Sequence, residues 1–225
     1  KGAIDSPAAP LSVEQFAHGQ SNPTYLIHGP KTKFVLRKQP PGKLLRGAHA
    51  VDREFTVMSA LAKSGVPVPK LILFCEDANV IGTPFYVCDY VPGRFFKEPA
   101  MRNAASPQER AALYGAFVKA IAALHSADYA ALGLSEFGRV GGYTERQTKV
   151  WTSQYRAAET ESMPAVERLI EWLPEALPAD DDLTTLVHGD LRVDNMIFDA
   201  DEPVDIRRCK DRITVNKREG VSLPT

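Results

Sequence analysis

The residue pattern changes near residue 95, from short apolar runs to long amphipathic segments, and this change limits the folds open to the 225-residue chain. Residues 48–65 predict a helix, because apolar side chains recur there every three to four positions. Strand-like runs, rich in β-branched and aromatic residues, occupy 16–27, 33–40, 70–77 and 84–93. The last two runs predict an antiparallel hairpin. The first part of the chain therefore predicts the order β-β-α-β-β.

The rest of the chain is predicted to be helical. Residues 106–128 begin with Ser and Pro, which are favourable at the N-cap and at the first position of a helix. Residues 141–159 and 163–177 predict two further helices, the second ending near Pro174 or Pro178. A β-rich unit followed by a helical unit, joined by the segment "DYVPG", predicts an α+β fold with two lobes and a ligand-binding cleft between them.

Composition narrows the functional classes. The net charge of −1 gives no overall field that would attract nucleic acid or an anionic membrane. No stretch reaches the roughly 18 apolar residues that span a bilayer, so neither nucleic acid nor membrane is expected as a partner. Cys75, Cys88 and Cys209 are odd in number and lack metal-ligand spacing. They favour a reducing compartment, which fits the cytoplasm and is also compatible with an organelle; no signal peptide is visible.

The stretch "LVHGDLRVDNMIFD", residues 186–199, is the part of the chain that most strongly indicates chemistry. Asp190 can accept a proton from a substrate hydroxyl, and the amide oxygen of Asn195 can coordinate a hard cation such as Mg²⁺. Phosphoryl transfer needs both functions beside one phosphate. Arg192 adds a fixed positive charge for the transferred group. The spacing alone is equally typical of a polar turn between two strands.

Upstream residues form an ordered set that suits nucleotide phosphates. The small polar turn "HGQSN" includes Ser21 and Asn22 and can approach phosphates with backbone N–H groups. Arg37 lies at the end of a strand, and Glu54 on the next helix could pair with it and hold it toward the phosphates. Taken singly, these residues are typical of a hairpin turn and of solvated charges. Their order along the chain is what indicates a nucleotide site.

The loop H-G-D-L-R-V-D-N resembles the catalytic loop of the aminoglycoside phosphotransferase and choline kinase-like enzymes, relatives of the protein kinases, whose loop reads H-R-D-L-K-x-x-N. The similarity continues in order through "GQSNPTYLI", "FVLRKQPPGKLL", "DREFTVMSAL", "VPVPKLILFCED" and "FYVCDYVPGRFF". The segments "IAALHSADYAALGL" and "FGRVGGYTERQTKVWTSQY" are similar to the kinase-like domain attached to some acyl-CoA dehydrogenases. The resemblance covers about residues 14–204 and implies a protein kinase-like two-lobe fold.

The resemblance implies roles for the residues of the loop. Asp190 matches the catalytic base that accepts the proton of the substrate hydroxyl. Asn195 matches a magnesium ligand, and Arg192 matches the loop cation of protein kinases. His188 and His125 match positions with structural roles.

Upstream, the resemblance implies a nucleotide site. Arg37 matches the strand cation that contacts the phosphates, with Arg in place of the more usual Lys, and Glu54 matches its partner on the helix. The remaining matches, in the phosphate-covering turn and in the hinge that holds adenine through its backbone, are Ser21, Asn22, Asp89 and Val91.

The implied activity is ATP-dependent transfer of the γ-phosphate to a hydroxyl of a small molecule, with ATP and Mg²⁺ as cofactors. Similarity to the dehydrogenase-associated branch points to a hydroxyacyl metabolite as acceptor, and to fusion or association with an acyl-CoA dehydrogenase in full-length relatives. The implied organisation is a lead-in at 1–12, a nucleotide-binding lobe at 13–93, a partial helical lobe at 94–204 and an atypical basic tail at 205–225.

The match to the family stops near Val204. In the family, a further apolar strand ends in a metal-binding Asp, and more helices complete the large lobe. Here residues 205–225 hold six basic and three acidic residues. Asp211 lies at about the right distance from Asn195 but lacks the flanking pattern. The expectation is a C-terminally truncated domain with a weakened metal site and exposed apolar helix faces.

Three interpretations of function remain open at this point. The first is an active phosphotransferase. The second is a catalytically inactive fragment that binds a nucleotide or a protein partner. The third, a metal-dependent hydrolase that uses His188 and Asp190, has no second cluster of ligands to support it.

Overall fold

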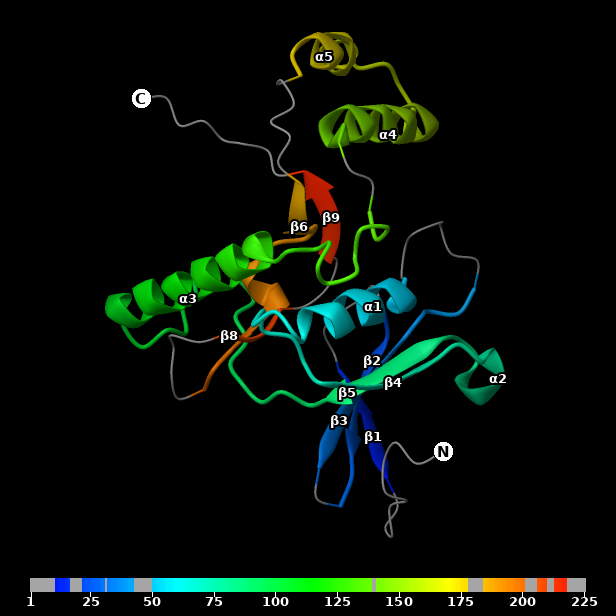
Figure 1. Ribbon diagram of the computed structural model, residues 1–225. Coiled ribbons are helices and arrows are strands. Elements are labelled where there is room, and N and C mark those ends of the chain that lie inside the picture. Colours follow the sequence, from blue (N-terminus) through cyan, green and yellow to red (C-terminus); the bar gives the residue numbers. More distant parts are fainter. Residues whose placement is uncertain are drawn as a thin grey trace.

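The N-terminal half is built on one antiparallel sheet of five strands, in the order β1-β2-β3-β5-β4 (Figure 1). The bounds are β1 Ser12–Gln15, β2 Thr24–His28, β3 Lys33–Lys38, β4 Leu71–Cys75 and β5 Phe85–Asp89. The computed structural model describes residues 11–16, 22–30, 32–42, 50–138, 141–177, 184–200, 206–209 and 213–217.

The predicted hairpin of residues 70–77 and 84–93 is present, as the antiparallel pair β4–β5. The prediction of a single strand across 16–27 is wrong, because residues 12–15 and 24–28 form two separate antiparallel strands, β1 and β2. All four residues of β1 are exposed and their sequence is SVEQ. This strand pairs through its backbone at the edge of the sheet. Its sequence does not alternate between apolar and polar residues, so the pattern does not predict a strand there.

A second element missed by the sequence pattern is the short helix α2, Ala78–Ile81. The side chain of Asp77 accepts a hydrogen bond from Asn79 N–H at its start, and Gly82 ends it in the left-handed conformation with φ of 88°. Helix α2 spans four residues, which is too few to show a helical period. It connects β4 to β5.

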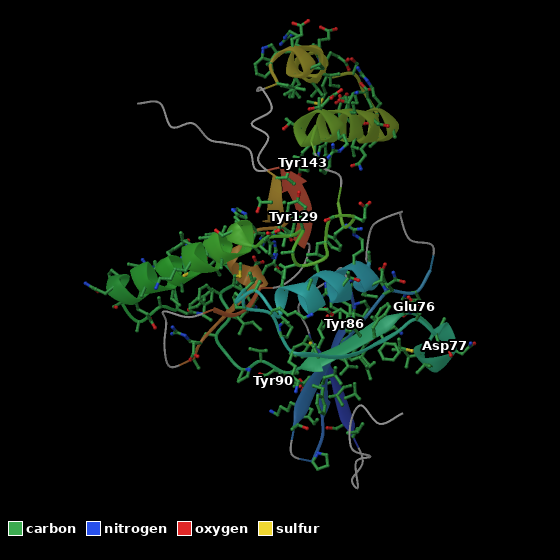
Figure 2. The ribbon with its side chains drawn as sticks, in the orientation of Figure 1. Glu76, Asp77, Tyr86, Tyr90, Tyr129 and Tyr143 are labelled. Atoms are coloured by element: carbon green, nitrogen blue, oxygen red, sulfur yellow. The ribbon has the colours of Figure 1, made fainter. Side chains whose placement is uncertain are left out.

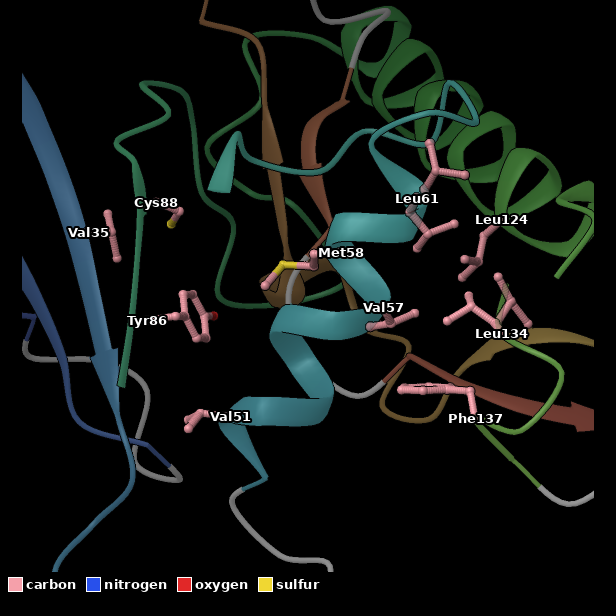
Figure 3. Packing of buried hydrophobic residues seen from close by; sticks show 12 residues of the cluster. Val35, Val51, Val57, Met58, Leu61, Tyr86, Cys88, Leu124, Leu134 and Phe137 are labelled. Carbon is pink, nitrogen blue, oxygen red and sulfur yellow. The ribbon is translucent and has the colours of Figure 1, made fainter. Parts of the chain in front are cut away.

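Helix α1, Val51–Leu61, occupies the centre of the molecule. Its buried side chains belong to a hydrophobic cluster that also contains Val35, Tyr86 and Cys88 from the sheet. The same cluster includes four residues of the C-terminal half, and Figure 3 shows three of them on the side of α1 opposite the sheet. These four are Leu124, Leu134, Phe137 and Leu186. One continuous core therefore joins the two halves through α1.

The C-terminal half begins with the predicted helices. They are α3 Pro107–Ser126, α4 Tyr143–Ala158 and α5 Pro164–Glu175. Ser106 is the N-cap of α3, and its hydroxyl oxygen accepts a hydrogen bond of 3.1 Å from Glu109 N–H. The Glu109 carboxylate accepts a hydrogen bond from Ala105 N–H and pairs with Arg94, and these two contacts lower the pKa of Glu109. The two hydrogen bonds satisfy the backbone N–H groups of Glu109 and Ala105 and so stabilise the start of α3.

Short strands follow the helices. They are β6 Thr184–His188, β7 Met196–Phe198, β8 Ile206–Cys209 and β9 Ile213–Lys217, with a 3-10 turn, Val193–Asn195, before β7. Strands β6 and β9 form one antiparallel pair, and β7 and β8 form another. The backbone of the basic tail thus returns to pair with both strands that flank residues 189–195. None of the helices in the described part of the chain is long and apolar enough to cross a bilayer.

We predict that Leu61→Ala lowers the free energy of unfolding by about 2–5 kcal/mol, the usual cost of emptying a core site. Leu61 is fully buried in the cluster that joins the two halves. Urea titrations followed by far-UV circular dichroism measure the change. Val80→Ala is the matched control, because Val80 is 57% exposed, and its effect should stay within about 0.5 kcal/mol. A loss below about 1 kcal/mol for Leu61→Ala would contradict the central position of α1 in the core.

Candidate active site

Arg37 of β3 and Glu54 of α1 form an ion pair between the sheet and the helix. Arg37 Nε lies 2.8 Å from Glu54 Oε2, and Arg37 Nη2 lies 3.4 Å from Glu54 Oε1. The Arg37 residue is 6% exposed, and the side chain of Glu54 is 13% exposed. An ion pair shielded from water in this way is stronger than one at the surface, because water screens it less. The strand and the helix thus bring together the two charges that the sequence pattern suggested could pair.

Three further residues surround this pair. Asn22 Nδ2 donates to Glu54 Oε1 at 2.9 Å, and the Tyr86 hydroxyl donates to Glu54 Oε2 at 3.1 Å. On the other side, Arg37 Nη1 donates to Thr24 Oγ1 at 3.2 Å. Figure 2 shows Tyr86 between α1 and the sheet. Sequence reasoning missed Thr24 and Tyr86. Tyr86 can be recognised as a site residue only from the strand register, which places it opposite Arg37.

Asp89 and Val91 lie where the sheet leads into the second half of the chain. Asp89 N–H donates to Lys70 O at 2.9 Å, and Tyr90 N–H donates to Lys33 O at 3.1 Å. These bonds hold the segment against β3 and against the start of β4. The backbone N–H of Val91 forms no hydrogen bond to the described part of the chain. The predicted hinge thus has backbone N–H groups bonded to the sheet at Asp89 and Tyr90, and an N–H at Val91 that bonds to none of the described residues.

The segment after the hinge contacts β7 directly. Arg94 N–H donates to Phe198 O at 2.8 Å, and Phe198 N–H donates to Arg94 O at 2.9 Å. A Cβ atom on Gly93 would lie 2.3 Å from the carbonyl oxygen of Phe198 and 2.4 Å from Cγ2 of Ile197. Glycine is required at position 93 because the two backbones approach so closely. The hinge and the strand after residue 195 are thereby tied together.

Asp190 and Asn195 contact each other across the turn that follows β6. Asn195 Nδ2 donates to the backbone carbonyl of Asp190 at 2.7 Å and to Asp190 Oδ2 at 3.2 Å. Asp190 is exposed, so its carboxylate is accessible to a ligand. His188 is buried, and its Nδ1 accepts a hydrogen bond of 3.2 Å from Asp190 N–H. This hydrogen bond fixes the backbone of the loop at Asp190.

Arg192, also predicted as a site residue, lies in the same loop but contacts a different residue. Arg192 is exposed, and its Nη2 pairs with Asp194 Oδ2 at 2.7 Å, within the same loop. Ser21 and Asp211 lie outside the described residues.

The residues present suit a magnesium ion in chemical type. Mg²⁺ prefers oxygen ligands and is commonly held by one or two protein groups together with substrate phosphates and water. Because Asn195 turns its amide nitrogen toward Asp190, its amide oxygen faces away from that residue and is available as a ligand. In the described ranges, no three His, Cys, Asp or Glu side chains gather into a metal cluster. Asn195 would act there together with substrate phosphates and water.

Comparison with known proteins is decisive for the family. The sequence pattern of the phosphotransferase enzyme family matches residues 12–205. The chain belongs to this phosphotransferase family. The match includes the sheet, α1, the hinge and the loop that contains Asp190.

Similar regions occur within longer proteins. The phosphotransferase chain is 52% identical over 189 residues to mouse acyl-CoA dehydrogenase family member 10, covering 84% of this chain and 18% of the relative. It is 46% identical over 194 residues to human acyl-CoA dehydrogenase family member 11, covering 86% of this chain and 25% of the relative. The chain thus spans about a fifth to a quarter of these relatives. The predicted resemblance to this branch is confirmed.

Solved structures confirm the kinase-like fold. A crystal structure from Ralstonia eutropha, of a protein assigned to the aminoglycoside phosphotransferases, is 42% identical with a TM-score of 0.82, covering 96% of this chain and 63% of that one. The ternary complex of APH(2″)-IIa with streptomycin and ATP is 16% identical with a TM-score of 0.63, covering 92% and 67%. At this identity the second likeness concerns the fold alone, a five-stranded antiparallel sheet followed by helices.

We predict that Gly93→Ala destabilises the chain by roughly 1–3 kcal/mol, because the new methyl group would overlap the carbonyl of Phe198. Hydrogen exchange at the amides of Arg94 and Phe198 should accelerate as their mutual bonds break. The control is Gly115→Ala in α3, where the added methyl group would meet no atom within 4 Å beyond its chain neighbours and the nearby helix backbone. That change should stabilise the helix by about 0.5–1 kcal/mol. Unchanged exchange in Gly93→Ala would contradict the close approach.

Proposed function

We propose that this chain carries an ATP-dependent phosphotransferase site that transfers the γ-phosphate to a hydroxyl group of a small molecule. The observation that supports this most is the contact between Asn195 and Asp190. It puts a candidate metal ligand beside an exposed carboxylate in a loop with the sequence H-G-D-L-R-V-D-N. Phosphoryl transfer requires these two functions next to each other.

In this proposal, one group of residues acts on the acceptor hydroxyl and another group binds the nucleotide. Asp190 orients the acceptor hydroxyl and takes its proton, while Asn195 holds Mg²⁺, which supplies charge neutralisation at the phosphates when bound. Arg37, held by Glu54, contributes positive charge at the nucleotide phosphates. The backbone at Asp89 and Val91 holds the base. Arg192 adds charge at the rim of the loop.

Support for ATP and for the acceptor comes from related proteins. A structure of the same fold contains ATP. The more similar relatives are acyl-CoA dehydrogenase family members, so we propose a hydroxyacyl metabolite as the acceptor and an acyl-CoA dehydrogenase as a fused or associated partner.

A second candidate function is a partner-binding module that does not catalyse transfer. The observation that favours it is a set of exposed apolar side chains on and beside α4 and α5. Exposed apolar groups of this size often mark interaction surfaces. Their members are Val150, Trp151, Met163, Leu169 and Trp172, which are 46–64% exposed.

We predict that Asp190→Asn lowers the rate of ATP consumption with hydroxyacyl and other hydroxylated acceptors by roughly 10²–10⁴-fold, the usual contribution of a general base. ADP release in a coupled assay, with MgCl₂ present, measures the rate. The affinity for ATP should change little, because Asp190 acts on the acceptor.

The matched control is Asp77→Asn. Asp77 is exposed at the N-terminus of α2, where Asn caps a helix equally well, and Figure 2 shows it at the far end of the sheet. Equal rates in Asp190→Asn and in the unchanged chain would reject Asp190 as the base. ATP binding without any magnesium-dependent turnover would favour the binding module instead.

A further inference from the structure

The side chain of Arg37 is part of a closed ring of hydrogen bonds. Arg37 donates to Glu54 on one side and to Thr24 Oγ1 on the other. Thr24 Oγ1 in turn donates to the carbonyl of Asn22 at 3.0 Å, and the Asn22 amide donates to Glu54 at 2.9 Å. Tyr86 adds a donor from outside the ring at Glu54. The ring links β2, β3 and α1, and Tyr86 brings in β5.

The geometry fixes both the position and the plane of the guanidinium group. A guanidinium is a rigid planar fork, so contacts on two of its sides determine how it is turned. Glu54 contacts Nε and Nη2, and Thr24 contacts Nη1. A lysine has a single ammonium group at the same reach and could not be held in this way. The use of Arg at this position therefore matches the residues around it.

Asn22 and Tyr86 are both 1% exposed, and their polar groups are directed at the same carboxylate. Each binds a different oxygen of Glu54, and so each restrains one side of it. Buried polar groups need partners, and a donor to a charged carboxylate is stronger than a neutral pair. The side chain of Asn22 is thus engaged within the protein, whereas the role predicted for this turn at the phosphates belongs to its backbone N–H groups.

We propose that Asn22 and Tyr86 are positioning residues that act through Glu54 to hold Arg37 in one orientation before a nucleotide binds. This inference rests on the proposed nucleotide site. All members of the ring are protein atoms, so a nucleotide would meet a cation that is already ordered. Binding then loses less side-chain entropy than it would with a mobile Arg or Lys.

The test uses Tyr86→Phe, which removes one hydroxyl and keeps the ring within the core. ADP and adenosine are titrated by calorimetry with MgCl₂ present. Losing one donor to a charged group should weaken ADP binding by about threefold to tenfold. Adenosine binding should be unchanged, because adenosine has no phosphates for Arg37 to contact. Asn22→Leu, which is similar in volume, should give the same split between the two probes.

The matched control is Tyr114→Phe. Tyr114 is 37% exposed on α3, and its hydroxyl donates to Pro99 O at 2.6 Å, away from the ring. The Tyr114→Phe variant should bind ADP and adenosine with the same affinity as the unchanged chain. Equal losses for ADP and adenosine in Tyr86→Phe would show general damage and would overturn the positioning role. No loss of ADP affinity would overturn it as well.

A second readout separates this inference from the proposed function. The exchange of the Arg37 Nε–H with water, measured by ¹⁵N NMR without nucleotide, should be slow in the unchanged chain and several-fold faster in Tyr86→Phe. If the unchanged chain binds neither ADP nor adenosine, the nucleotide site is rejected. The positioning role is then rejected too, even if Tyr86→Phe accelerates the exchange of the Arg37 Nε–H. If it binds ADP and exchange does not respond to Tyr86→Phe, the positioning role alone is rejected.

Discussion

The carboxylate of Glu54 is the interaction on which the rest of the candidate site depends. It lies on α1 and accepts hydrogen bonds from Arg37, Asn22 and Tyr86, which come from β3, from the segment just before β2, and from β5. A shielded charge with too few partners would strongly destabilise the fold. The donors around it therefore make the sheet and α1 interdependent, and a change in one shifts the cation at position 37.

Helix α1 has a second dependence, on the C-terminal half. Its apolar face lies in the cluster that includes Leu124 of α3 and Leu186 of β6. Arg53, next to Glu54, also lies over the ring of Phe137, with Cζ 4.2 Å from its centroid. The helix that holds Arg37 through Glu54 is thus packed against the elements that lead into the Asp190 loop. The bridge between Arg94 and Phe198 ties the halves together a second time, at the hinge.

Much of this could be predicted from local sequence. The β4–β5 hairpin, the three helices and the Ser106 cap follow from periodicity and capping, which depend on near neighbours. The contact between Asp190 and Asn195 follows from a spacing of a few residues in one loop. Strand β1 could not be predicted, because an exposed edge strand needs only backbone partners. Nor could the return of the tail backbone to β6 and β7.

The sequence by itself determined the family, the three long helices of the C-terminal half and the residue types at the candidate site. The tertiary structure alone decided that Tyr86 and Asn22 meet Glu54, and that Gly93 lies against the Phe198 carbonyl. The physical reason is the distance along the chain over which each kind of interaction acts. Propensity and spacing act over one turn or one strand, whereas these contacts depend on strand register and on packing between segments that are distant in the chain.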